Sequence, residues 1–197
     1  MFQNGITKRI SLLDEAGATV ESLQDLLKVE GDESLLQSLL LVATEYAERY
    51  LSRTIVSGTW MRQFDGPASR GGLQREDKML RWAYLPYPPL VSVDKVYSLD
   101  TDGNQSDITG YYVDEGSTPA RLVFTQTFGG RSIAQVRIEY TCGYGGEYAS
   151  GVPYLIQQGI LQHAAYMYEH RGDCGAEQAA KLSGATGTYG MYRVGLI

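Results

Sequence analysis

The spacing of apolar residues changes twice along this chain of 197 residues, and these changes constrain its fold more than any other feature. Residues 20–28 and 32–51 carry apolar side chains at three- and four-residue intervals, as on one face of a helix. From about residue 55 to residue 141, short segments alternate large and polar side chains, which is typical of strands. Residues 153–171 return to helical spacing. This order predicts an α+β fold, in which packed α-helices flank an inserted antiparallel β region.

The predicted helices carry residues that favour helix ends. Thr19 and Asp32 precede the first two helices, where a short polar side chain can accept a hydrogen bond from the backbone. Pro153 stands in the first turn of the third helix, where its missing N–H costs nothing. Gly172 follows the last turn, where a left-handed residue is favoured. These residues support the boundaries that the apolar spacing predicts.

The chain is expected to form one domain between two terminal extensions. Residues 1–18 show weak patterning and are predicted to be an N-terminal arm. Residues 19–172 are the predicted domain, which contains the β insertion at 55–141. Residues 173–197 are predicted to be a flexible tail, because glycine recurs in a small, polar segment before the apolar end MYRVGLI.

The negative charge of the chain is concentrated near its N-terminus. The net charge is −6, and residues 1–48 alone hold nine acidic and three basic residues, whereas the remainder is balanced. Tight binding to DNA phosphates needs a basic stripe, and no long run of Lys or Arg occurs here. The composition therefore argues against a DNA-gripping protein, although an acidic surface can lie beside DNA that has to slide.

The chain lacks the residue spacing that would support an enzyme or a metal centre. His163 and His170 lie about two helical turns apart, with Cys174 beyond them, whereas zinc ligands normally lie one turn apart or in a close cysteine pair. Cys142 and Cys174 are interpreted as reduced thiols, with a disulfide as the alternative. The glycine-rich segment after Cys142 lacks the GK[ST] ending of a phosphate loop, and no GxSxG motif occurs. We predict no catalytic residues, metal or cofactor, and no membrane span.

A set of short motifs in a fixed order resembles one family of particle proteins. The set covers roughly residues 19–194. Its members are Thr19, YAERYL at 46–51 with Arg53, Trp60, LPYPPLVSV at 85–93, DG at 102–103, YYVD at 111–114, PARL at 119–122, Tyr140, GYG at 143–145, VP at 152–153, YEHR at 168–171 and YRV at 192–194. Their order and spacing resemble the head–tail connectors, or head-completion adaptors, of long-tailed double-stranded-DNA phages and gene transfer agent particles.

This resemblance implies a structural role in a particle. Such proteins form a ring, usually a dodecamer, under the portal protein in the virion neck, and double-stranded DNA passes through it. A tail-side stopper or completion protein docks beneath the ring, and the subunits are made in the bacterial host cytoplasm. The C-terminal tail typically engages the portal, a role that falls here on Met191, Tyr192, Arg193 and Val194. The glycine- and arginine-rich loop at 66–78 is longer than in the simplest members.

The residues leave two interpretations open for the tail and for the acidic helices. A tethered apolar peptide can add to the sheet edge of a partner, or it can fold back on its own subunit. The acidic residues Glu21, Asp25, Glu45 and Glu48 could line the channel and repel DNA within a Debye length of about 10 Å. Alternatively, they form a solvated outer helix face.

Two further function classes stay open at this stage. The first is a small hydrolase or a nucleic-acid-processing accessory protein, and the second is a soluble binding module that never forms a ring. The fifteen tyrosines suit surfaces that become buried on assembly, because each combines a large apolar ring with a polar tip. They also suit the edges of a sandwich-like core.

Overall fold

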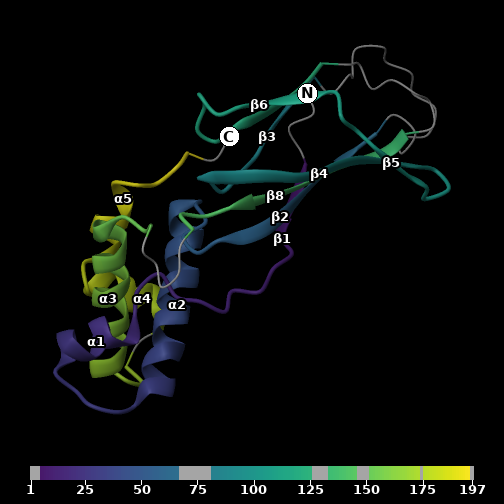
Figure 1. Cartoon of the computed structure of the whole chain (residues 1–197). Coiled ribbons are helices and arrows are strands. Elements are labelled where there is room, and N and C mark those ends of the chain that lie inside the picture. The colour runs from purple at the N-terminus through teal and green to yellow at the C-terminus, as the bar shows by residue number, and fades with distance from the viewer. Residues whose placement is uncertain (1–4, 67–80, 126–132, 146–150, 174, 196–197) are drawn as a thin grey trace. The chain divides into compact units, whose positions relative to one another are not determined.

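The chain divides into two compact units, which we call the β unit and the helical unit (Figure 1). The β unit comprises Met1–Ser11 and Gly58–Cys142, and the helical unit comprises Leu12–Ser57 and Gly143–Ile197. The structure is a computed structural model. It describes residues 5–66, 81–125, 133–145, 151–173 and 175–195.

The β unit contains two antiparallel sheets. The larger sheet has the strand order β1-β2-β8-β4-β5, and the smaller has the order β3-β7-β6. The strands are β1 (Ile6–Arg9), β2 (Gly58–Asp65), β3 (Trp82–Tyr84), β4 (Leu90–Asp100), β5 (Gln105–Asp107), β6 (Tyr111–Asp114), β7 (Arg121–Phe124) and β8 (Ile133–Cys142). Strands β2 and β8 alternate buried and more exposed residues, so each presents one face to the core, as the period of two in the sequence predicts.

The core of the β unit is built from the inward-facing residues of both sheets. Ile138, Tyr140 and Leu122 are fully buried there. The Tyr140 hydroxyl donates a hydrogen bond to the Pro86 carbonyl at 3.2 Å, which ties the proline-rich segment before β4 to β8. Burial raises the pKa of the Tyr140 hydroxyl, so this residue remains a neutral donor.

The helical unit packs five helices around one apolar core. The helices are α1 (Val20–Leu27), α2 (Glu33–Leu51), α3 (Tyr154–Glu169), α4 (Ala176–Leu182) and α5 (Ala185–Gly190). Leu36 and Leu40 of α2 and Ile156 and Ile160 of α3 are fully buried in this core. The apolar spacing of both helices is therefore explained by their packing, and the predicted α+β fold is confirmed. No helix among the described residues is long and apolar enough to cross a membrane.

The ends of the helices follow the sequence in part. The Thr19 hydroxyl accepts a hydrogen bond from the Ser22 amide at 3.2 Å, so Thr19 caps α1 as predicted. Asp32 precedes α2 but makes no side-chain cap; its carboxylate instead accepts a hydrogen bond from the Tyr168 hydroxyl at 3.0 Å. Pro153 is the residue before α3 rather than a member of its first turn. Gly172 has a φ of +86°, as expected for a residue beyond a helix end.

Both predicted terminal extensions contain structure that the sequence analysis missed. Within the predicted arm, residues 6–9 form β1 on the edge of the larger sheet, and Ala16 and Ala18 are buried in the helical unit. Within the predicted tail, α4 and α5 bury Ala179, Ala180 and Tyr189. These elements are too short to show a clear period, and the partners that bury them come from distant parts of the chain.

Candidate functional site

The predicted portal-binding residues lie against the C-terminal end of α2. We call residues 191–195, which follow α5, the C-terminal segment. The Val194 amide donates a hydrogen bond to the Leu51 carbonyl at 2.9 Å. The Arg53 Nε donates to the Tyr192 carbonyl at 2.7 Å. The segment is therefore held by two bonds to its backbone, one of which satisfies a carbonyl at the end of α2 that has no partner within the helix.

Side chains add to this contact. The Arg193 guanidinium lies 5.3 Å from the centre of the Tyr50 ring, a cation–π distance, and Tyr192 packs against the helical core. Arg53 also donates to the Tyr144 hydroxyl at 3.4 Å, and burial raises the pKa of Tyr144. Met191 stays 68% exposed. In this structure the C-terminal segment lies on its own subunit, and its neighbours Arg53 and Tyr144 were not identified from the sequence.

The four acidic residues predicted to face a channel do not share one environment. Glu21, Asp25 and Glu45 are exposed. Glu48 is buried, and its carboxylate accepts hydrogen bonds from the amides of Ile55 at 2.8 Å and Val56 at 3.3 Å. Glu48 therefore holds the chain that follows α2, and we remove it from the set of candidate channel residues because its charge does not reach solvent.

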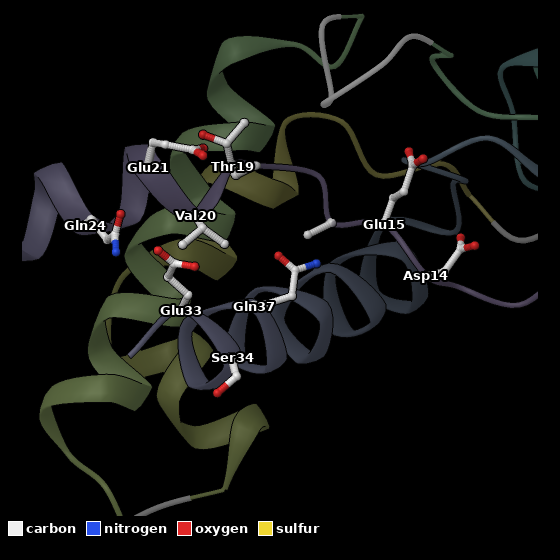
Figure 2. A pocket seen from close by; sticks show the side chains of 11 residues that line it. Asp14, Glu15, Thr19, Val20, Glu21, Gln24, Glu33, Ser34 and Gln37 are labelled. Carbon is white, nitrogen blue, oxygen red and sulfur yellow. The ribbon is translucent and has the colours of Figure 1, made fainter. Parts of the chain in front are cut away.

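An acidic pocket lies where the first turns of α1 and α2 meet the segment before α1 (Figure 2). Its volume is about 670 Å³, and four carboxylates line it, from Asp14, Glu15, Glu21 and Glu33. None of the residues that line it is basic. Of the four carboxylates, only Glu21 could be singled out from the sequence, since the other three become its neighbours through folding. Such a pocket repels phosphate and attracts cationic groups.

The two histidines have separate structural surroundings. His163 of α3 is fully buried, and its Nε2 lies 2.8 Å from the Ala176 carbonyl at the start of α4. Because a carbonyl oxygen only accepts, Nε2 carries the proton and donates it. Its ring also meets the edge of the Tyr46 ring at 5.2 Å. His170 stacks on Tyr166 at 4.0 Å, near the end of α3. His163 is thus a packing residue that joins α2, α3 and α4.

The cysteines and possible metal ligands form no centre in the described residues. Cys142 is a buried free thiol, and burial raises its pKa to about 12, so it is unreactive at neutral pH. Cys174 lies outside the described residues. The described residues contain no group of three His, Cys, Asp or Glu side chains that could hold a metal ion.

We expect His163 to make the helical unit sensitive to acid. Burial lowers its pKa below the ordinary value of 6.5. The unfolded chain therefore binds a proton more readily than the folded chain, and stability is lost as the pH falls below about 6.5 towards the folded pKa. Chemical denaturation of wild type and His163→Gln across this range should show a steeper loss for wild type. Identical slopes for the two proteins would contradict the assignment.

Neither protein-family models nor curated protein sequences match this chain. Solved structures do. The neck of an empty gene transfer agent (GTA) particle, computed with C6 symmetry, contains a chain with a TM-score of 0.74 and 18% identity, over 98% of this chain and 97% of that one. The neck of the native particle, computed with C12 symmetry, gives 0.73 and 18% over the same shares. The virion of the native particle gives 0.73 and 19%. This chain therefore has, over nearly its whole length, the fold of a chain in gene transfer agent particle necks.

Proposed function

We propose that this protein is a non-enzymatic head–tail connector in the neck of a gene transfer agent or tailed-phage particle. The observation that carries this proposal is the likeness to neck structures, which extends over 98% of the chain and so includes both units. A partial likeness would have allowed a shared domain with a different task. The burial of Cys142 and His163 supports a structural role, because these reactive groups are used in packing.

The ring arrangement is part of the same proposal. The similar structures were computed with C6 and C12 symmetry, which supports a ring of this chain, with twelve copies under the portal. DNA would pass through the ring without sequence-specific binding. The acidic pocket and the exposed Glu21, Asp25 and Glu45 suit such passage, since they repel phosphates within about 10 Å. A tail-side stopper or completion protein would dock on the opposite end.

The C-terminal segment is the proposed anchor for the portal. In the isolated chain its backbone is bonded to Leu51 and Arg53, so a portal has to compete with these bonds. Each of these bonds is weak, because a typical hydrogen bond contributes only about 1 kcal/mol net. Twelve such segments binding together would exceed the affinity of any single one. Exposed Met191 offers the first apolar contact to a partner.

Deleting residues 191–197 should abolish binding to the cognate portal protein. Electron microscopy and co-sedimentation of the two purified proteins would measure the complex. Arg53→Ala is the matched control, because it removes the bond to the Tyr192 carbonyl while residues 191–197 remain part of the protein. We expect this variant to bind the portal at least as well as wild type. Undiminished binding by the truncated protein would assign the anchor to another surface.

A further inference from the structure

The smaller sheet of the β unit carries an aromatic row on its outward face. In register, Trp82 of β3 lies opposite Val123 of β7, which lies opposite Tyr112 of β6. Trp82 is 40% exposed and Tyr112 is 55% exposed. Tyr84, two residues from Trp82, shares this face and meets the Trp82 ring edge-on at 4.8 Å. We call the patch formed by Trp82, Tyr84, Tyr112 and Val123 the aromatic face.

The opposite face of the same sheet packs against the core of the β unit. Ala83 and Leu122, which alternate with the residues of the aromatic face, are buried in the core of the β unit. A sheet with one face on a core normally presents polar residues on the other face. The larger sheet of this unit follows that rule, since Lys95, Glu139 and Arg137 lie on its outward side. The aromatic face departs from it.

The two charged side chains next to the aromatic face neutralise each other. Arg121 and Asp114 lie opposite each other in the next row, beside Tyr84, and the Arg121 Nε donates to the Asp114 carboxylate at 3.0 Å. The Asp114 pKa is lowered by this bond. A polyanion such as DNA therefore finds no net positive charge to bind here. A protein surface with little net charge can cover the aromatic face while the pair stays intact at its edge.

The distribution of charge between the two units favours another copy of the chain as the partner. The sequence of the helical unit holds thirteen acidic and six basic residues, a balance of −7. That of the β unit holds ten acidic and eleven basic residues, a balance of +1. Copies that meet through two helical units repel each other, whereas a contact that involves the nearly neutral β unit avoids this repulsion.

We propose that the aromatic face is an interface with a second copy of this chain. The inference rests on the proposed ring, because it names a surface through which neighbouring subunits meet. A closed ring joins two different surfaces of adjacent subunits, so the aromatic face packs against another part of its neighbour and not against its own equivalent. Trp and Tyr are enriched at the centres of such interfaces.

Photo-crosslinking of the full chain tests this interface without any other particle protein. p-Benzoylphenylalanine replaces Tyr112 in one protein and, as the control, Tyr154, an 88% exposed tyrosine of the helical unit, in another. After irradiation at equal high concentration, position 112 should yield several-fold more crosslinked dimer than position 154. Peptide mapping should place the crosslink on a residue outside the aromatic face of the second copy. Adding Trp82→Ser to the position-112 protein should reduce the yield at least twofold, with an unchanged circular dichroism spectrum.

Equal dimer yields from the two positions would overturn the inference, as would an unchanged yield in the Trp82→Ser protein. The same position-112 protein is then irradiated in assembled particles. A crosslink there to a different particle protein, in place of a second copy, would also overturn it. Failure of the chain to join heads to tails, with the dimer crosslink intact, would count against the proposed function alone.

Discussion

Replacing Glu48 with alanine is expected to lower the free energy of unfolding by about 3 kcal/mol. The carboxylate is buried and accepts hydrogen bonds from the amides of Ile55 and Val56. On folding, these two amides exchange water for the Glu48 carboxylate as their hydrogen-bond acceptor. Without the carboxylate, both buried N–H groups are left unpaired. Such an N–H group costs about 1–3 kcal/mol when it is left unpaired. For a chain of this size the midpoint of thermal unfolding should fall by roughly 6–12 °C.

Glu45→Ala is the matched control, because it removes a carboxylate one turn earlier on the same helix. Glu45 is exposed and pairs with Arg49 at 2.7 Å. Pairs of this kind contribute only about 0.3–0.5 kcal/mol. Scanning calorimetry of both variants should separate a buried structural acid from a surface one. Equal destabilisation would mean that Glu48 does not hold the chain after α2, and its place among channel-facing acids would have to be reconsidered.

Replacing Gly143 with alanine is expected to destabilise the protein by about 3 kcal/mol or more. Gly143 has a φ of +130°, which residues with a side chain rarely adopt. An added Cβ would also lie 2.6 Å from the Ser57 Cα and 2.7 Å from the Ser57 nitrogen. Backbone atoms cannot rotate away as a side chain can. The next residue, Tyr144, donates its amide to the Ile55 carbonyl at 3.1 Å, and this bond holds the two segments together.

Gly184→Ala is the comparison variant, because it introduces a side chain at a positive φ without steric overlap. Gly184 also has a positive φ, of +80°, but an added Cβ would meet nothing within 4 Å. We expect it to cost about 1 kcal/mol. The difference between the two variants in urea unfolding measures the close contact with Ser57 together with the additional strain of a φ of +130°. If both variants lower the free energy of unfolding by the same amount, the backbone around Gly143 adjusts to the added Cβ without cost. The close approach to Ser57 is then not required for stability.

The burial of Glu48 alters the interpretation of the acidic N-terminal region. Under the proposed function, the charges that could face DNA are those of Glu21, Asp25 and Glu45, together with the pocket carboxylates of Asp14, Glu15 and Glu33. Most of these lie in the segment before α1 and in the first turns of α1 and α2. A test of electrostatic repulsion in the particle should therefore neutralise this group and leave Glu48 intact, because loss of Glu48 would confuse stability with DNA passage.

Long periodic elements could be read from the sequence almost to the residue. The predicted helices at 20–28, 32–51 and 153–171 appear as α1, α2 and α3, which begin and end within two residues of those limits. The β insertion at 55–141 matches the long segment Gly58–Cys142 of the β unit. These elements were predictable because an amphipathic face repeats over several turns or strand residues, and each repeat adds to the same signal.

Short elements and buried polar contacts could not be predicted in this way. Strand β1 has four residues and α5 has six, too few for a period to emerge. Tyr189 of α5 is buried where Gly159 of α3 leaves room, since a Cβ at Gly159 would lie 2.5 Å from the Tyr189 ring. That fit depends on two residues thirty positions apart, and the sequence around either residue does not predict it.

The sequence by itself determined the α+β class, the main helices, the uneven charge and the resemblance to connector proteins, because each follows from local spacing, composition or motif order. Only the tertiary structure decided that Glu48 is an internal hydrogen-bond acceptor, that the C-terminal segment is bound to its own α2, and that four carboxylates share one pocket. The physical reason is that hydrogen bonding and burial depend on which residues, distant in the sequence, come into contact. Local spacing and composition do not specify those contacts.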